Sequence, residues 1–215
     1  MWRTACLSLL AALLAYAAGA WLTLDFEVWT AEGARRLAVV RSPVPAPDVV
    51  VRGPDMHDTA LPALLAADGG VTIIDFVYTR CQTVCLALGN SFQQLQSALQ
   101  AGEREGAAGA PRIRLLSISF DPAHDDPAVL SAYAARLQAD PRLWRFAAPA
   151  PAAALRGLLE RFEVVVIPDG MGGYDHNAAL LVVDGRGRLV RIFDYDQTQA
   201  ALAFARHLAA QEAAG

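Results

Sequence analysis

Two cysteines lie four positions apart in the segment DFVYTRCQTVCLALG (75–89), where an apolar strand is predicted to give way to a helix. On a helix, Cys81 and Cys85 would share one face, with Cβ atoms about 5–6 Å apart. A disulfide needs Cβ atoms about 3.5–4.5 Å apart, so closing it would strain the turn. Two thiolates can instead hold one metal ion, each at about 2.3 Å. The spacing favours metal binding, and reversible oxidation stays open as an alternative.

The start of a helix is also a favourable place for thiolates. The N-terminal backbone amides of a helix lower the pKa of a nearby thiol, and Arg80 adds positive charge directly before Cys81. Soft thiolates select Cu(I), Zn(II) or similar ions, and such a site normally recruits a third or fourth ligand.

Four histidines are available as that further ligand. His57 lies in a polar turn, His124 in an acidic, proline-containing loop, and His207 on the last predicted helix. His176 differs, because it follows the glycine-rich loop PDGMGGY and opens the predicted strand NAALLVV. A mobile loop there can present an imidazole beside a sheet. His176 is therefore the candidate third ligand, although spacing alone leaves open that it merely caps a strand.

Composition and charge exclude two other classes of protein. Hydrophobic residues make up 54% of the chain and charged residues 19%, which is not the composition of a disordered protein. The formal net charge is −4, and no lysine- or arginine-rich run is present. Nucleic acid is therefore not an expected partner.

The first 24 residues are predicted to be a membrane anchor. Thr4–Leu24 contains 21 consecutive uncharged residues, enough for about 30 Å of helix, which is the thickness of a bilayer's hydrocarbon core. Arg3 precedes this segment and acidic residues follow it, so the rest of the chain is expected outside the cytoplasm, on the periplasmic side in a bacterium. A cleaved signal peptide is the alternative. Cys6 falls inside the segment, which leaves Cys81 and Cys85 as the thiols of the exported part.

Strands alternate with helices over most of the remaining chain. Residues 25–48 are predicted to form a strand–turn–strand over 26–40 and a proline-rich connector, and residues 49–215 a thioredoxin-like domain. The predicted strands are 71–77, 112–119, 143–147, 178–184 and 188–195, the last two forming a hairpin, and the predicted helices are 82–100, 128–138, 151–162 and 198–211. We therefore expect an α/β fold, a mixed sheet flanked by helices, with an N-terminal hairpin addition and an N-terminal transmembrane helix.

Three ordered motifs resemble those of one known family. DFVYTRCQTVC resembles the F-x-Y-T-x-C-x-x-x-C signature of the SCO/SenC copper-binding proteins. SISFDPAHDDPAVLSAY resembles that family's D-P-x-x-D-x-P-x-x-L-x-x-Y segment, and YDHNAALLVVDGRGRLV resembles its D-H-[SN] strand. The resemblance spans residues 71–195.

The resemblance implies a thioredoxin-like fold and a copper site. Its ligands would be Cys81, Cys85 and His176, with Asp121 and Asp125 in a supporting structural role. It also implies a task, which is to deliver copper, as Cu(I) or Cu(II), to the copper A centre of cytochrome c oxidase, or to keep the cysteines of that centre reduced. The implied partners are the oxidase subunit that carries this centre, or another copper acceptor, and the membrane.

The chain departs from the commonest family pattern in two places. Gln82 and Leu86 stand where many members have a proline after each cysteine, which leaves the identity of the copper recipient open. The alternative function is an exported thiol–disulfide oxidoreductase, in which Cys81 attacks and Cys85 resolves. The plainest alternative is that both thiols are buried spectators.

Overall fold

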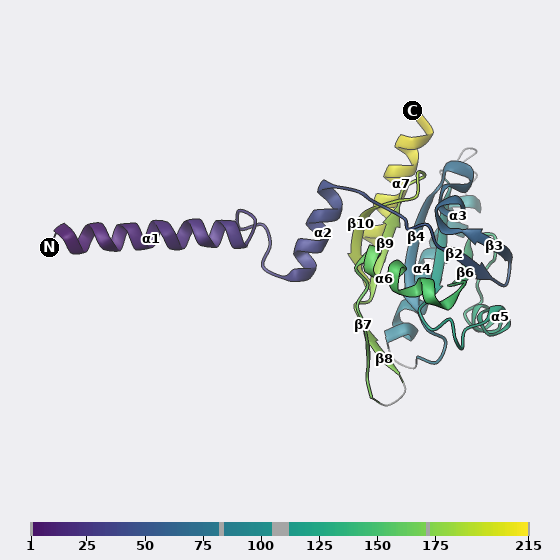
Figure 1. Ribbon diagram of the computed structural model, residues 1–215. Helices are drawn as coiled ribbons and strands as arrows, with labels where there is room; N and C mark the ends of the chain where they lie inside the picture. The colour runs from purple at the N-terminus through teal and green to yellow at the C-terminus, as the bar shows by residue number, and fades with distance from the viewer. Residues whose placement is uncertain (1, 82–83, 105–111, 171–172, 215) are drawn as a thin grey trace. The chain divides into compact units, whose positions relative to one another are not determined.

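The computed structural model describes residues 2–81, 84–104, 112–170 and 173–214 (Figure 1). The side chains at 68, 84–87 and 103–104 lie outside that description. The chain divides into two units, Met1–Arg41 and Ser42–Gly215, and each is described here by itself.

The first unit begins with a long apolar helix. Helix α1 (Trp2–Leu22) has 21 residues, a mean hydropathy of 1.9 and no buried residue. Its length and composition suffice to cross a membrane, and a signal sequence near an N-terminus would meet the same test. The predicted apolar helix is confirmed, and its use as an anchor stays a prediction.

The strand–turn–strand predicted over 26–40 is wrong. The structure has a second helix there, α2 (Ala31–Arg41). The Thr30 hydroxyl accepts a backbone N–H three residues on at 3.0 Å, which caps the helix start. Glu32 then pairs with Arg35 at 2.9 Å, one helical turn away. This cap and the ion pair along the helix favour helix over the predicted strand–turn–strand.

The second unit is built on one eight-stranded mixed sheet with the order β1-β10-β9-β4-β5-β6-β2-β3. Strands β4, β5 and β6 run parallel, whereas the other neighbours pair antiparallel. The sheet, together with its order, confirms the predicted fold class. Its strands are β1 (Val44–Pro45), β2 (Val50–Gly53), β3 (Met56–Ala60), β4 (Val71–Val77), β5 (Ile113–Ser119), β6 (Trp144–Pro149), β9 (Ala179–Val183) and β10 (Arg188–Asp194).

Helices cover both faces of this sheet (Figure 1). On one face the ring of Trp144 in β6 packs on Phe92 of α4, and α4 packs on α7. On the other face Phe76 of β4 packs against Phe162 of α6 at 6.2 Å between ring centroids. The helices of this unit are α3 (Leu61–Ala66), α4 (Val84–Arg104), α5 (Pro127–Arg136), α6 (Leu155–Phe162) and α7 (Thr198–Ala214), with the short 3₁₀ turns η1 (Ala67–Gly69) and η2 (Ala152–Ala154).

Strand β4 is the centre of the core. All seven of its residues are buried, because helices lie on both of its faces and β5 and β9 lie on its two edges. Its β-branched run VTIIDFV is what predicted a central strand. The strand ends four residues before Cys81, so the candidate site lies directly after the buried central strand.

One residue of β4 is exceptional. Asp75 is 1% exposed, and neither of its carboxylate oxygens has a hydrogen-bond partner among the described residues. Its neighbour in β5 is Ser117, whose hydroxyl oxygen accepts a hydrogen bond from the Trp144 indole at 2.9 Å. Burial raises the pKa of Asp75 to about 7, and the polar hydroxyl group of the neighbouring Ser117 opposes that rise more weakly.

This carboxyl predicts an unusual dependence of stability on pH. The group titrates near pH 3.8 in the unfolded chain and near 7 in the folded one, so the folded state binds more protons between these values. The free energy of unfolding should therefore fall as pH rises from about 4 to 7, by up to about 4 kcal/mol from this group. Asp75→Asn should remove this fall and raise stability at pH 8, as measured by urea unfolding in mild detergent across the pH range.

Asp184 provides the matched control for that substitution. It is equally buried, but its carboxylate accepts hydrogen bonds from the Arg188 backbone at 2.8 Å and from the Arg188 guanidinium at 2.9 Å. Asp184→Asn should therefore lower stability by about 1–3 kcal/mol at pH 8, the opposite sign. A wild-type stability that stays level from pH 4 to 7 would contradict the account of Asp75.

Candidate metal centre

Cys81 lies in the short connection between β4 and α4. It is 7% exposed, and its backbone N–H donates to the carbonyl oxygen of Tyr78 at 3.3 Å. This hydrogen bond turns the chain sharply after the strand. The thiol is therefore held close to the end of the central strand and shielded from most of the solvent.

Cys85 is the second residue of helix α4, as the predicted strand-to-helix junction requires. Its side chain, together with residues 82 and 83 between the cysteines, lies outside the described residues. The placement of both cysteines at the junction is thus established for the backbone, while their joint binding of a metal stays a prediction.

Asp125 fastens the segment before Cys81 to the neighbouring strand. Its buried carboxylate accepts hydrogen bonds from the Thr79 backbone at 3.1 Å, the Thr79 hydroxyl at 2.6 Å and the Ser119 hydroxyl at 2.6 Å. The side chain is only 1% exposed, so these three donors replace water around the charge. The supporting structural role expected of Asp125 agrees with this geometry.

Asp121 organises a second, more exposed cluster on the same turn. One carboxylate oxygen accepts a hydrogen bond from the Arg80 guanidinium at 2.7 Å, and the other lies 2.9 Å from Nδ1 of His124. The same Arg80 nitrogen lies 3.3 Å from Nδ1 of His124. The hydrogen bond to Asp121 raises the pKa of Arg80 above its usual value. The positive charge next to Cys81 is thereby fixed in place.

His176 comes from a hairpin that the sequence did not predict. Strands β7 (Val166–Pro168) and β8 (Tyr174–His176) pair antiparallel, with Val166 opposite His176. The expectation that His176 opens the next strand is wrong, because it ends β8 and β9 begins at Ala179. The adjacent Asn177 explains the break: its side chain accepts from the Val165 N–H at 2.8 Å and so closes the base of the hairpin.

The imidazole of His176 faces the segment that carries Cys81 through one intervening aromatic ring. Its centroid lies 5.1 Å from that of Phe120, which lies 5.2 Å from that of Tyr78. Burial lowers the pKa of His176, and the nearby charge of Asp175 opposes this effect more weakly. The neutral ring that metal binding requires is therefore favoured at neutral pH.

The structure thus brings the predicted site residues to one end of the sheet without showing a completed ligand set. Among the described residues, from which the Cys85 side chain is missing, no three His, Cys, Asp or Glu side chains are gathered closely enough to hold an ion. The donor types nevertheless suit a soft cation, since two sulfurs and one neutral nitrogen are the ligands that Cu(I) prefers. Of the other histidines, His124 lies beside Arg80 and Asp121, whereas His57 lies on β3 and His207 on α7.

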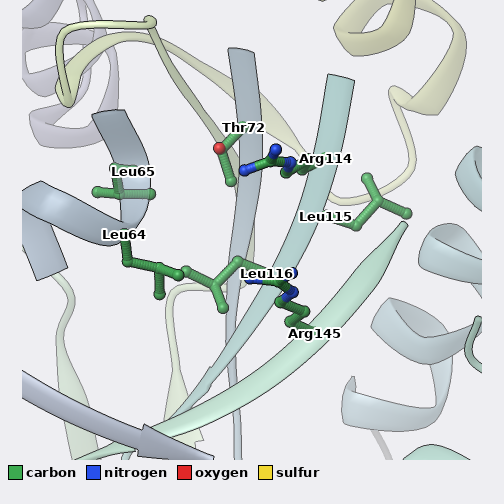
Figure 2. A pocket seen from close by; sticks show the side chains of 7 residues that line it. All are labelled: Leu64, Leu65, Thr72, Arg114, Leu115, Leu116 and Arg145. Atoms are coloured by element: carbon green, nitrogen blue, oxygen red, sulfur yellow. The ribbon is translucent and has the colours of Figure 1, made fainter. Parts of the chain in front are cut away.

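A separate hollow lies toward the start of β4, at the opposite end of the strand from Cys81 (Figure 2). Its volume of about 20 Å³ is room for one water molecule. Burial, and then the charge of Arg145, lower the pKa of Arg114 within it. The hollow is lined by Leu64, Leu65, Thr72, Arg114, Leu115, Leu116 and Arg145.

A mixed sheet with a cysteine pair directly after its central parallel strand defines a protein of the thioredoxin-like class. Within that class, the SCO1/SenC family model matches residues 65–209, which is more than half of the chain. The protein therefore belongs to the SCO1/SenC family, and the resemblance carried by the three motifs is confirmed.

Individual relatives support the same assignment. The SCO1 protein homolog of Bacillus subtilis is 26% identical over 136 residues, which cover 62% of this chain and 66% of the relative, just under two thirds of its length. Among solved structures, BsSco has a TM-score of 0.65 at 20% identity, and the match covers 79% of this chain and 95% of BsSco. BsSco is described as a member of the Sco family of cytochrome c oxidase assembly proteins in which a disulfide switch was identified. Bradyrhizobium japonicum ScoI with copper bound has a TM-score of 0.59 at 22% identity, covering 77% and 99%. These likenesses to solved structures show the fold.

The hydrogen bonds that the Asp125 carboxylate accepts from Thr79 and Ser119, called here the Asp125 clamp, lead to a testable prediction. Asp125→Ala would leave buried hydrogen-bond donors of Thr79 and Ser119 unsatisfied, which should lower the free energy of unfolding by about 2–4 kcal/mol. The segment before Cys81 should loosen as well, so a thiol-specific alkylating reagent should modify Cys81 faster than in the wild type. Both effects are measured on Cys6→Ser backgrounds by urea unfolding and mass spectrometry.

Asp126→Ala is the control for Asp125→Ala. Asp126 is the neighbouring carboxylate, and it caps α5 by accepting from the Val129 N–H at 2.9 Å. Its loss should cost about 1 kcal/mol and leave the alkylation rate of Cys81 unchanged. Equal alkylation rates in the two variants would mean that the Asp125 clamp does not protect the thiol.

Proposed function

We propose that this protein binds one copper ion through Cys81, Cys85 and His176 and delivers it to, or matures, the copper A centre of cytochrome c oxidase. The observation that carries the proposal is the meeting of two separate segments at one end of the sheet. One is the clamped connection that bears Cys81, and the other is the hairpin that bears His176. Copper in ScoI of Bradyrhizobium japonicum and in yeast Sco1, two structures of the same fold, supports the choice of metal.

The chemistry follows from the donor set, with copper as the cargo. Two thiols must each lose a proton to bind the ion, and the positive charge of Arg80 beside Cys81 favours that loss. The imidazole of His176 is already neutral at neutral pH because of its burial. A Cu(I) ion with two sulfurs and one nitrogen is three-coordinate, so a thiolate of the acceptor can approach it. Transfer then proceeds by ligand exchange without release of the free ion.

We further propose that the apolar helix α1 tethers the protein to a membrane. A tether through Trp2–Leu22 with the second unit outside the cytoplasm would keep the copper site near a membrane-bound acceptor. The recipient is the oxidase subunit that holds the copper A centre or another copper acceptor. In the sequence, Gln82 and Leu86 replace the family's usual prolines, so the acceptor need not be the family's usual one.

A copper titration tests the proposal. The reduced full-length chain in mild detergent should bind one Cu(I) per molecule in competition with a chromogenic chelator. Cys81→Ser and Cys85→Ser should each abolish tight binding, because a single remaining thiolate cannot hold the ion against the chelator. His176→Ala should weaken binding at least tenfold, since it removes the third ligand.

Two variants control that titration. Cys6→Ser removes the thiol of the apolar helix, and His207→Ala removes a histidine of α7, far along the chain from the site. Neither should change the stoichiometry or the affinity. Binding by His176→Ala that equals that of the wild type would deny the histidine its role, and loss of binding in Cys6→Ser would place the metal elsewhere.

A thiol–disulfide oxidoreductase is the second candidate function. A disulfide switch has been identified in BsSco, whose fold this chain shares. In that case Cys81 would attack a substrate disulfide and Cys85 would resolve the mixed disulfide, so that two substrate thiols form as the pair becomes oxidised.

Turnover separates the two functions. The oxidoreductase predicts reduction of a model disulfide peptide by the chain, regenerated by a dithiol reductant. That activity should vanish in Cys81→Ser and remain unchanged in His176→Ala. Failure of the wild type to turn over the peptide, with intact copper binding, would leave metal transfer as the function.

A further inference from the structure

Tyr78 is hydrogen-bonded to both segments that carry the predicted ligands. Its backbone carbonyl accepts from the N–H of Cys81 at 3.3 Å. Its phenolic oxygen accepts from the N–H of Tyr174 at 3.1 Å, and Tyr174 lies two residues before His176. The side chain is 5% exposed, so water competes little for this second hydrogen bond.

The hairpin is shaped to receive this hydroxyl. A Cβ atom placed on Gly173 would lie 2.5 Å from Oδ2 of Asp169 and 2.9 Å from the phenolic oxygen of Tyr78, both closer than real Cβ contacts come. A larger residue there would force at least one of these side chains to shift, whereas glycine leaves room for the hydroxyl at the Tyr174 amide. The two chain segments that follow β7 and precede β8 are joined by Asp169, whose carboxylate accepts from the Gly173 N–H at 2.9 Å.

Aromatic packing fixes the orientation of the docked hairpin. Phe120 lies between the two segments, with ring centroids 5.2 Å from Tyr78, 5.7 Å from Tyr174 and 5.1 Å from His176. The contacts with Tyr174 and His176 are edge-on, the arrangement that aromatic rings prefer. Phe120 is in turn held to the end of β4, since its N–H donates to the carbonyl of Val77 at 3.0 Å.

We infer that Tyr78 is a positioning residue that latches the His176 hairpin to the cysteine segment, and that breaking its hydroxyl–amide hydrogen bond is the step that frees the imidazole for copper release. The inference rests on the proposed function for its consequence, but the latch itself is a property of the metal-free protein. The ring of Tyr78 supplies core packing, whereas the hydroxyl alone supplies the latch.

Tyr78→Phe separates those two roles, because it keeps the ring and removes the hydroxyl. In the metal-free full-length chain, the backbone amides of 173–176 should exchange with deuterium about three- to tenfold faster than in the wild type, the effect of one lost hydrogen bond. The midpoint of thermal unfolding should move by no more than about 2 °C. Exchange is measured by mass spectrometry of proteolytic peptides, with the peptides of β4 and β9 as internal references.

Copper binding gives the second measurement. Tyr78→Phe should release Cu(I) to a competing chelator about three- to tenfold faster than the wild type. The nitrogen hyperfine coupling in the electron paramagnetic resonance spectrum of the Cu(II) form should weaken or become heterogeneous, because the imidazole is no longer held in one place. Neither change is expected from a residue that only fills the core.

Tyr174→Phe is the matched control, because it removes a hydroxyl from the same aromatic cluster and retains the amide that Tyr78 binds. It should leave amide exchange and copper release at wild-type values.

The outcomes distinguish this inference from the proposed function. Wild-type amide exchange in Tyr78→Phe would overturn the latch, whatever the chain does with copper. Faster exchange with unchanged copper release would overturn the claim that the latch controls release. If the wild type binds no copper, the proposed function is refuted. If amide exchange is nevertheless faster in Tyr78→Phe than in the wild type, the latch remains as a structural feature of the protein.

Discussion

The buried carboxylate of Asp125 is the interaction on which the candidate site depends. An ionised group that is almost entirely removed from water is tolerated only when nearby donors satisfy it. Here the donors are the backbone and hydroxyl of Thr79 and the hydroxyl of Ser119. The carboxylate stays satisfied only while the end of β5 and the segment after β4 lie side by side. This arrangement also fixes the position of Cys81, since only one residue separates it from Thr79.

The two halves of the site are held by different means. The cysteine segment is covalently continuous with the buried central strand and is clamped by a charge. The described contacts of the His176 hairpin with that segment include aromatic edges and the hydrogen bond from the Tyr174 N–H to the Tyr78 hydroxyl. Each such neutral contact is worth about 1 kcal/mol, less than a hydrogen bond to the buried Asp125 carboxylate, so we expect the hairpin to part from the site more easily than the cysteine segment does. This difference in how firmly the two halves are attached suits the proposed function, in which the protein both binds an ion and releases it.

Asp75 shows that the core beneath the site is not built for stability alone. A carboxyl with no hydrogen-bond partner among the described residues lies in the central strand, where an apolar side chain would be more stable. The parallel strands and helices around it supply enough buried apolar surface to retain it. Its neutral form dominates only up to about neutral pH, so the core becomes strained as the surroundings become alkaline.

The sequence by itself determined the elements whose signals are local. The β-branched run of β4, the helix over 128–138, the hairpin of β9 and β10 and the length of α1 could all be predicted, and the three motifs placed the chain in its family. Local signals failed in α2, where a strand–turn–strand was predicted and the structure has a helix capped by Thr30. Only the tertiary structure decided how the site is held, because its contacts join residues far apart in the chain: Asp125 to Thr79 across 46 positions and Tyr174 to Tyr78 across 96. No periodicity records such a contact, since it depends on the register of the sheet and on which helix covers which face. The β7–β8 hairpin, the Arg80–Asp121–His124 cluster and the Tyr78 hydrogen bonds therefore became visible only once the strands were in place.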